Sequence, residues 1–472
     1  MILNQFNKDE RMANWLPNIP EGPSPLYERL IAALEHDVHH GILRPGERLP
    51  PHRDLAHRLS LSVGTVSRAY GEAERRGLLS SHVGRGSYVA DHATVPLAMD
   101  AGPADMAQNA PPLAPSERWL NEGLNSLRQR ADLLDCLNYP PPEGLLAARH
   151  AGASWLRRRH RMTRATADRL IQCNGGQHGL ALAFSALARP GDTILCEAAT
   201  YAGIKTLAAH AGYNLHGVTM DDRGIDPEAI ARAARDTGAR ILVLIPTLQN
   251  PTTITLDPAR RADIIAIARQ YDLTIVEDEA YRVFAPENAP DSFAELAPER
   301  TLLVAGISKP IAPGLRLGFV LPPDGDALRD RLFMGLRAFG YSPPTLGPLL
   351  FSQWEQDGTA DKIADAVLAE SEARTRLAQD VLGTALAKPG AKRSLHLWMP
   401  MPAIDAERLT SRALRAGIAL TPPGAPIVAS NAPSGLRICL GAIRERGKLE
   451  TCLRALHGLL QPGSDKSALG VV

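Results

Sequence analysis

The sequence has few of the features that would place a protein in a membrane or an oxidising compartment. No apolar run approaches the 18 residues of a transmembrane helix, and residues 1–15 contain acidic side chains where a signal peptide would be apolar. The net charge of +1 favours no polyanionic partner for the chain as a whole. The cysteines are scattered and form no C-x-x-C pair, which supports neither a disulfide framework nor a zinc site: Cys136, Cys173, Cys196, Cys439 and Cys452. We therefore expect a cytoplasmic protein with reduced thiols.

The composition is that of an ordinary globular protein. Hydrophobic residues make up 44% of the chain and charged residues 22%, so neither disorder nor a fibrous class is indicated. A chain of 472 residues exceeds one ordinary core, and its length favours about two to four domains.

The N-terminal region has the pattern of three helices followed by a hairpin. Residues 1–24 end in a proline-rich lead-in, and apolar residues then recur at helical spacing before Gly41. A second short helix follows in the stretch LRPGERLPPHRDLAHRLS, and a third in SVGTVSRAYGEAERRG. Two short β-prone runs flank Gly84-Arg85-Gly86 and predict a hairpin. Three helices and such a wing are typical of a winged helix-turn-helix.

Charge within this region departs from that of the whole chain. Between residues 41 and 90, eight arginines face four acidic residues, a local excess of four positive charges. Arginine suits bidentate contacts with phosphate and guanine. The pattern therefore favours a DNA-binding surface, although a protein-docking module of the same shape is the alternative.

Residues 25–90 resemble the DNA-binding domain of the GntR regulators over its whole length. The resemblance implies double-stranded DNA as the partner. It implies that Arg53 on the second helix, Thr65 and Arg68 on the recognition helix, and Arg85 with Gly86 in the wing contact that DNA. Where the family often has an arginine after the serine that opens the recognition helix, this chain has Val63, so base readout is expected to use fewer side chains.

Strand and helix patterns alternate after a linker. Residues 91–116 are rich in proline, alanine and aspartate without a sustained period, which predicts a linker. From residue 117, short apolar runs such as ILVLIP and LTIVED alternate with amphipathic helices. Runs that are apolar on both faces are what a parallel sheet covered by helices requires. Beyond residue 323 the pattern changes to long helices and later strands, which predicts a smaller α+β part.

Five features fall where these strands end, the edge at which such sheets bind ligands. They are the turn Gly175 to Gly179, Asn250, Asp278 with Tyr281, Lys309, and Arg316. Taken singly, each has an ordinary structural explanation as a turn, a helix cap or a solvated side chain. Together they supply an anion site at a helix N-terminus, a carboxylate for a ring nitrogen, donors for a phenolate oxygen and an amine for an aldehyde. That set predicts pyridoxal 5′-phosphate as the cofactor.

Residues 117–460 resemble the fold-type-I aminotransferases. The resemblance implies that Lys309 is the catalytic lysine, which holds the cofactor as an aldimine, and that Asp278 pairs with the pyridinium nitrogen. It places Asn250 and Tyr281 at the ring oxygen and Tyr201 on the ring face.

The same resemblance implies the residues around the phosphate and the substrate. Gly176, Gln177, Ser308 and Arg316 would bind the phosphate. Tyr139 would reach it from a second subunit, and Arg437 would bind the α-carboxylate of an amino acid through a bidentate guanidinium. No metal is implied.

This chain departs from the family at four positions. Gly176 and Gly306 stand where relatives often have phosphate-binding serines, Thr253 replaces the last glycine of the common NPTG, and Ala199 replaces a usual proline. We therefore expect weaker phosphate binding than in an enzyme.

Both resemblances, in this order, are the architecture of the MocR subfamily of GntR regulators. The expected fold class is multidomain: an N-terminal winged helix-turn-helix, then an α/β fold-type-I aminotransferase-like domain with a smaller C-terminal α+β subdomain. The expected boundaries are 1–24, 25–90, 91–116, 117–322 and 323–472. The predicted function is a pyridoxal-phosphate-dependent transcriptional regulator, a domain-swapped homodimer that senses a small amino effector. An active aminotransferase carrying a DNA-binding module and a direct sensor of pyridoxal phosphate are the alternatives.

Overall fold

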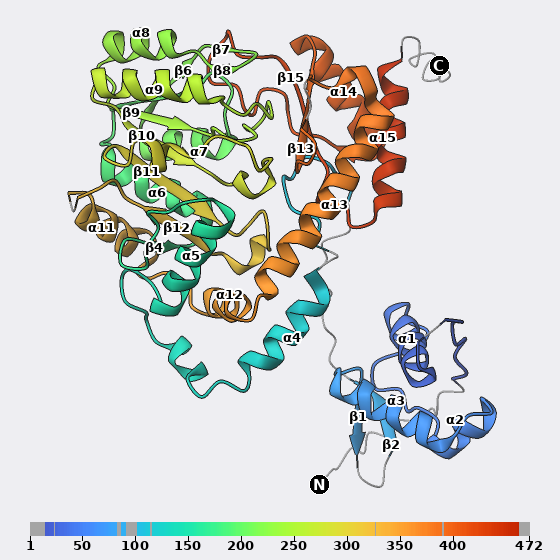
Figure 1. Ribbon diagram of the computed structural model, residues 1–472. Coiled ribbons are helices and arrows are strands. Elements are labelled where there is room, and N and C mark those ends of the chain that lie inside the picture. The colour runs from blue at the N-terminus through green and yellow to red at the C-terminus, as the bar shows by residue number, and fades with distance from the viewer. Residues whose placement is uncertain are drawn as a thin grey trace, which may run out of the picture. The chain divides into compact units, whose positions relative to one another are not determined.

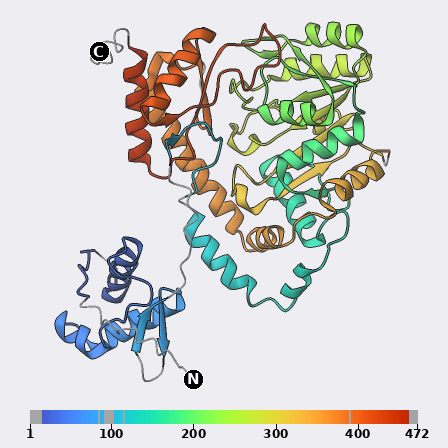
Figure 2. The same cartoon turned by 180° about the vertical axis from the view of Figure 1, so that it is seen from behind.

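The chain consists of two compact units, residues 1–101 and 102–472. The structure is a computed structural model that describes residues 15–22, 24–82, 86–90, 102–113, 116–325, 327–388 and 391–461 (Figure 1 and, from behind, Figure 2). Among the helices of these ranges, none has the length and apolar character that a membrane span requires.

The N-terminal unit is a winged helix-turn-helix, as the sequence predicts. It contains helices α1 (Leu26–His39), α2 (His52–Arg58) and α3 (Val63–Arg75) and the antiparallel hairpin β1 (Leu79–His82) to β2 (Gly86–Val89). Ser62 caps α3, its side chain accepting a hydrogen bond from Thr65 N at 3.0 Å. Buried residues at helical spacing form the core: Leu30, Ile31, Leu34, Leu55, Val66 and Tyr70.

The proline-rich lead-in contributes one large side chain to this core. Trp15 is buried, and its Nε1 donates to Asp37 Oδ2 of α1 at 2.7 Å. The packed part of the unit therefore begins before residue 25.

A seven-stranded sheet organises the second unit. Its strand order is β4-β12-β11-β10-β9-β5-β6. The bounds are β4 Ile171–Cys173, β12 Gly318–Leu321, β11 Thr301–Gly306, β10 Thr274–Asp278, β9 Ile241–Leu244, β5 Thr193–Glu197 and β6 Asn214–Val218.

The sheet is mixed, whereas the apolar runs predict a parallel one. Strand β12 runs antiparallel to both of its neighbours, with Gly318 opposite Gly306 of β11. The chain turns back between these two glycines through the short 3-10 helix η4 (Pro313–Leu315). The return strand is too short and too uniformly apolar for its direction to be read from the sequence. The antiparallel direction of β12 matters for the site, because the turn that reverses the chain between β11 and β12 contains Lys309 and Arg316.

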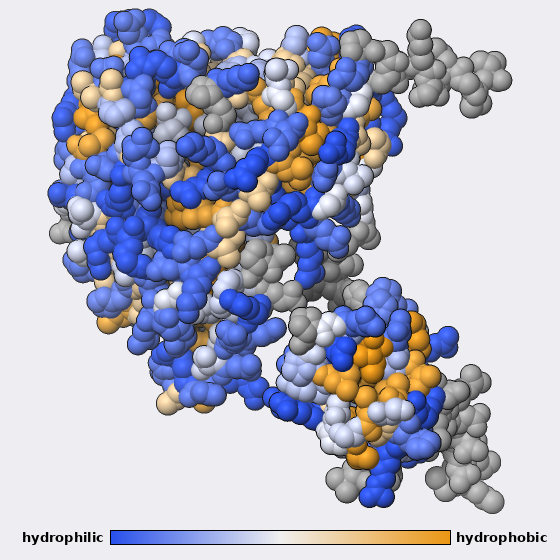
Figure 3. Space-filling view, turned by 45° about the vertical axis from the view of Figure 1, so that its right-hand side comes forward, coloured by the Kyte–Doolittle hydropathy of each residue, from blue (hydrophilic) through white to orange (hydrophobic). Residues whose placement is uncertain are grey.

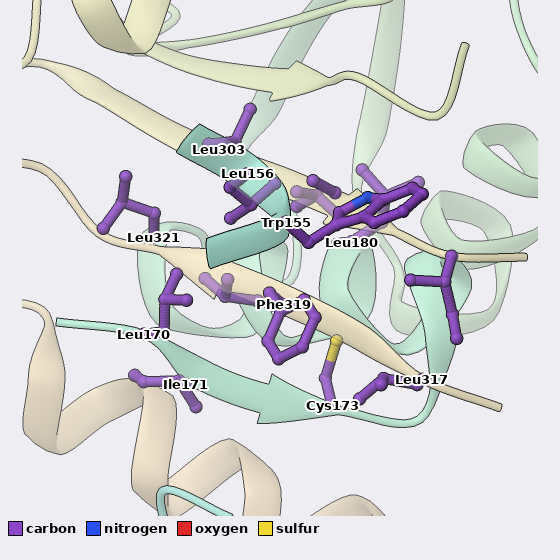
Figure 4. Packing of buried hydrophobic residues seen from close by; sticks show 14 of the residues in the cluster. Trp155, Leu156, Leu170, Ile171, Cys173, Leu180, Leu303, Leu317, Phe319 and Leu321 are labelled. Carbon is purple, nitrogen blue, oxygen red and sulfur yellow. The ribbon is translucent and has the colours of Figure 1, made fainter. Parts of the chain in front are cut away.

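Helices cover both faces of this sheet. One core packs under α5 (Leu146–Arg159), α6 (Gly175–Leu187), α11 (Arg329–Gly340) and α12 (Leu346–Gln356). The other lies under α8 (Pro227–Thr237), α9 (Pro258–Gln270) and α10 (Phe293–Leu296). Successive strand residues alternate between the cores, Val276 in the first and Ile275 in the second. Figure 4 shows the first core, where Phe319 and Leu321 of β12 lie among side chains of α5 and α6.

A smaller α+β lobe completes the unit, as predicted. Its antiparallel pair is β13 (His396–Pro400) with β15 (Gly435–Cys439), and helices α14 (Ala403–Arg415) and α15 (Arg446–Leu460) pack on the same core as the end of α13 (Thr359–Leu382). Residues 102–113, which the composition predicts to be linker, belong to this lobe. Their strand β3 (Ala104–Asp105) pairs in parallel with β14 (Ile418–Ala419), and Met106 is fully buried.

The remaining elements connect these layers. They are α4 (Glu117–Leu127), η2 (Leu133–Leu137), α7 (Ala202–Ala211), the hairpin β7 (Met220–Asp221) to β8 (Gly224–Ile225), η3 (Arg282–Phe284) and η5 (Gly383–Ala385). Helix α4 ends at Leu127, and the next element along the chain is the 3-10 turn η2.

Candidate cofactor pocket and DNA-binding surface

A cavity of about 170 Å³ lies at the carboxyl ends of β10 and β11. Among its lining side chains is one that the sequence does not predict, Asn109. The others include nine predicted site residues: Gly176, Gln177, Tyr201, Asn250, Asp278, Tyr281, Ser308, Lys309 and Arg316. The fold thus brings together residues that are up to 140 positions apart, as a set of strand ends should.

Lys309 enters this cavity from the turn after β11. Its Nζ donates a hydrogen bond to the main-chain oxygen of Asn109. Burial lowers the pKa of the Lys309 amine to about 8, and the nearby Asp278 carboxylate opposes part of that shift. Roughly a tenth of the amine is therefore uncharged at pH 7, far more than for an ordinary lysine, and the uncharged form is the one that attacks a carbonyl carbon.

Asp278 ends β10 as a buried carboxylate. Its Oδ1 accepts a hydrogen bond from Ala280 N at 3.1 Å. Burial raises the pKa of this carboxyl group to about 6, and the hydrogen bond from Ala280 N opposes only part of that shift. A cation placed against Asp278 would remove that cost, and a protonated ring nitrogen is such a cation.

Tyr281 lies three residues later and is also buried. Its hydroxyl receives hydrogen bonds from Asn109 Nδ2 at 2.9 Å and from Asn250 Nδ2 at 3.3 Å. Burial raises the pKa of Tyr281 above its ordinary value. The hydroxyl therefore keeps its proton and can donate it to an oxygen in the cavity.

The start of α6 and Arg316 form the end of the cavity whose chemistry suits an anion. Gly175 has a φ of +78°, and a Cβ there would lie 2.7 Å from Arg316 Nη2, so only glycine fits. Arg316 Nη2 donates to Asn174 O at 2.8 Å. The guanidinium is thus held at the N-terminus of a 13-residue helix, where both backbone N–H groups and the helix dipole favour a phosphate.

Arg437 of β15 lies next to this cavity. It donates to Asn250 Oδ1 at 2.9 Å, to Thr421 Oγ1 at 2.9 Å and to Ala107 O at 2.7 Å. Its Nε is buried and has no hydrogen-bond partner among the described residues. A carboxylate is the ligand that would use this free N–H together with the terminal nitrogens.

Tyr139 is the one predicted cofactor residue that the fold does not bring to its own chain's pocket. Its side chain is 77% exposed, and its ring contacts that of Tyr341 with centroids 4.8 Å apart. A role at the phosphate therefore depends on a second copy of the chain.

Sequence reasoning misses two residues of the site. Asn109 lies in the stretch predicted to be linker, and His396 lies on β13, 287 residues later. Asn109 Nδ2 and His396 Nδ1 are 3.0 Å apart, and His396 Nε2 is 3.2 Å from Gln249 O. Neither residue belongs to a recognisable motif, so only the packing of β3 and β13 against the large lobe reveals them.

The cavity fits pyridoxal 5′-phosphate. Two buried polar atoms, Gln177 Oε1 and Asn109 Oδ1, have no hydrogen-bond partner among the described residues, and both side chains line the cavity. The cofactor would be held by Asp278 at its ring nitrogen, by Asn250 and Tyr281 at its ring oxygen, and by Arg316, Ser308 and the start of α6 at its phosphate. When bound, it supplies a carbonyl carbon to which amines attach reversibly.

The predicted DNA contacts lie on α2, α3 and the hairpin. Arg53 is exposed on α2, and Thr65 is held by the Ser62 cap. The guanidinium of Arg68 stacks 4.0 Å from the ring centre of Tyr27, so a phosphate or base would have to be contacted beside that ring. Val63 is 44% exposed at the first turn of the recognition helix.

The wing is described only in part. Gly86 opens β2 with a φ of +102°, and a Cβ there would lie 3.1 Å from Arg48 Nε. Arg85 lies outside the described residues.

Two families match the chain, one for each unit. Residues 26–89 match the gntR family of bacterial regulatory proteins, and residues 103–456 match the class I and II aminotransferases. The uncharacterized HTH-type transcriptional regulator YdeF of Bacillus subtilis is 31% identical over 328 residues, which are 68% of this chain and 70% of YdeF.

Further similarity extends over nearly the whole chain. The HTH-type transcriptional regulator TauR of Rhodobacter capsulatus is 27% identical over 451 residues, 85% of this chain and 90% of TauR. The crystal structure of an archaeal alanine:glyoxylate aminotransferase superposes with a TM-score of 0.68 at 18% identity, covering 84% of this chain and 94% of the other, which shows a shared fold. Because a gntR helix-turn-helix precedes a domain of the class I and II aminotransferase family, the chain belongs to the MocR subfamily of GntR transcriptional regulators, whose aminotransferase-like domain binds pyridoxal 5′-phosphate.

Proposed function

We propose that this regulator senses an amino acid in the cofactor pocket and changes its DNA binding in response. One observation carries the proposal. Lys309 and Arg437 are both linked to the segment 107–109, since Arg437 donates to Ala107 O and Lys309 to Asn109 O. An amino acid brings an amine that competes with Lys309 and a carboxylate that pairs with Arg437. The effector is therefore a small molecule with both groups.

The chain's own residues have distinct tasks in this sensing. Arg437 binds and orients the effector carboxylate, and Asn250 holds Arg437 in place. Lys309, with a pKa of about 8, accepts or releases a proton as it gives way to the effector amine. A ligand changes a conformational equilibrium only through contacts that differ between the states. The contacts of Lys309 and Arg437 are such contacts.

The protein acts as a homodimer in this proposal. Two winged helices would bind two half-sites of one operator, and Tyr139 of one copy would reach the phosphate end of the other copy's pocket. The exposure of Tyr139 on its own chain supports this arrangement.

An active aminotransferase is the second candidate. It is favoured by the intact set Lys309, Asp278 and Arg437, since binding and turnover use the same residues. The two functions are separated by mixing the cofactor-loaded protein with a panel of amino acids and measuring both the cofactor's absorbance and the keto acid formed. A sensor changes absorbance and operator affinity without accumulating keto acid over many equivalents. Repeated turnover would refute the pure sensor.

The third candidate, a direct sensor of the cofactor, is tested by Lys309→Ala. We expect the variant to lose its cofactor on desalting and its response to amino acids, while the exposed Lys362→Ala control keeps both. An effector response that survives in Lys309→Ala would contradict sensing through this lysine.

A further inference from the structure

Residues 102–113 connect the cofactor pocket to the N-terminal part of the chain. They are the first described residues after 91–101. Their main chain is fixed to the small lobe: Ala104 N donates to Gly417 O at 2.7 Å, Met106 N to Ala419 O at 2.9 Å, and Cys439 N to Met106 O at 3.0 Å. The side chain of Met106 is fully buried in that lobe. This segment therefore moves with the small lobe.

The end of the segment reaches into the cofactor cavity. Asn109 O accepts from Lys309 Nζ, and Asn109 Nδ2 bonds Tyr281 OH at 2.9 Å. The same amide nitrogen lies 3.0 Å from His396 Nδ1. Burial lowers the pKa of His396 to about 3, so its ring is neutral, and the ring donates to Gln249 O and accepts from Asn109. One asparagine thus joins the large lobe, through Tyr281 and Lys309, to the small lobe, through His396.

Two residues earlier, the segment contacts the proposed effector-binding arginine. Ala107 O accepts from Arg437 Nη2 at 2.7 Å and from Thr421 Oγ1 at 3.1 Å. An amino effector therefore competes with Ala107 O for an N–H group of Arg437, and by taking the place of Lys309 at the cofactor it frees the Lys309 amine to donate to Asn109 O. Both ends of the effector act on main-chain oxygens that are two residues apart.

We propose that residues 106–110 transmit occupancy of the pocket to the chain that leads to the DNA-binding unit, with Asn109 as the positioning residue. This inference rests on the proposed function and adds the element through which it operates. Exchange of the bonds that Arg437 and Lys309 make to Ala107 O and Asn109 O shifts the segment, while Asn109's bonds to Tyr281 and His396 determine in which direction. Without the Asn109 amide, the effector still binds but no longer changes DNA affinity.

The test compares Asn109→Ala with Gln108→Ala in the full-length, cofactor-loaded protein. Gln108 is the exposed neighbour of Asn109, and no side-chain hydrogen bond is found for it among the described residues. The probe is aminooxyacetate, which carries both an amine that reacts with carbonyl groups and a carboxylate. Cofactor absorbance reports occupancy of the pocket, and fluorescence anisotropy reports affinity for a DNA site selected from a random library by the wild-type protein.

We expect aminooxyacetate to change the operator Kd of the wild type and of Gln108→Ala by about 5-fold or more, the size of ordinary allosteric coupling. In Asn109→Ala the change should fall below about 2-fold while the absorbance still responds. An Asn109→Ala variant that responds like the wild type would overturn the inference. A wild type whose absorbance responds but whose DNA affinity does not would instead refute the proposed function.

If Asn109→Ala fails to bind the cofactor, the same test is made with Asn109→Asp. It keeps the size of the side chain and removes the N–H donors to Tyr281 and His396. The inference again predicts an absorbance response without a DNA response. Loss of cofactor in both variants would show that Asn109 only builds the pocket, which also overturns the inference.

Discussion

At the scale of single residues, burial moves two pKa values of the pocket in opposite directions. It lowers that of Lys309 to about 8 and raises that of Asp278 to about 6. Between the ordinary carboxyl value near 3.9 and about 6, the cofactor-free folded chain binds more protons at Asp278 than the unfolded chain. Its free energy of unfolding therefore falls as pH rises through this window, by roughly 3 kcal/mol in total.

Asp278→Asn should remove this cost. The amide oxygen can still accept from Ala280 N. We expect the cofactor-free variant to be up to about 3 kcal/mol more stable than the wild type at pH 7 and equally stable at pH 4, where the carboxyl group is protonated. Urea unfolding at both pH values measures this. The variant should bind cofactor at least about 10-fold more weakly, because a ring cation loses its counter-charge. If the variant and the wild type were equally stable at pH 7, neighbouring groups would have to stabilise the Asp278 carboxylate more than its burial implies.

Gly176 and Gly306, the two glycines that we expect near the cofactor phosphate, differ in the space around them. A Cβ on Gly176 meets no atom within 4 Å, whereas one on Gly306 would lie 3.1 Å from Leu317 O of the neighbouring chain segment. Gly176→Ser should therefore add a hydroxyl to the helix N-terminus and tighten cofactor binding by about 2- to 10-fold, the worth of one hydrogen bond. Gly306→Ser is the matched control and should give no gain. Titration of the cofactor-free proteins, followed by absorbance, checks both, and an equal effect of the two changes would contradict the argument.

At the scale of elements, the sequence predicts most of this fold because each element has a local signature. The cap at Ser62, the apolar runs of β9 to β11 and the glycine-rich first turn of α6 all lie where the pattern puts them. The direction of β12 and the joining of β3 to β14 have no such signature, since both depend on pairing between distant segments. The same reason explains which residues of the site could be predicted from the sequence. Lys309 and Asp278 follow strands, whereas Asn109 and His396 reach the pocket through contacts between the lobes.

The position of β12 in the sheet can be tested through its contact with α5. A Cβ on Gly152 of α5 would lie 2.3 Å from Cζ of Phe319, a ring that Figure 4 shows within the core. Gly152→Ala should destabilise the large lobe by about 1–3 kcal/mol through overpacking. Gly458 of α15 has open space around its Cα, so Gly458→Ala should be neutral or stabilising by up to about 1 kcal/mol. Thermal unfolding distinguishes them, and an unchanged melting temperature in Gly152→Ala would show that Phe319 can move aside.

At the scale of the whole molecule, exposed apolar side chains are the candidates for the surface that a second copy would cover in the proposed homodimer. Figure 3 shows hydrophobic patches between hydrophilic residues on the face that it presents. Leu137 is 81% exposed, Tyr139 77% and Tyr341 63%, and the two tyrosine rings are in contact. Burying a side chain of this size contributes about 1.5–3 kcal/mol, so a monomer that exposes several of them together gains by dimerising.

The double substitution Leu137→Asp with Tyr341→Asp should therefore turn a dimer into a monomer. Sedimentation velocity should show the wild type at twice the mass of one chain and the variant at that of one chain. Leu414→Asp on α14 is the control, because Leu414 is 57% exposed but lies on the small lobe, and it should remain dimeric. If Tyr139 completes the phosphate site of the other copy, the monomeric variant should also bind cofactor more weakly, although neither substituted residue lines the pocket. A monomeric variant with undiminished cofactor affinity would still identify the dimer surface, but it would exclude Tyr139 from the cofactor site.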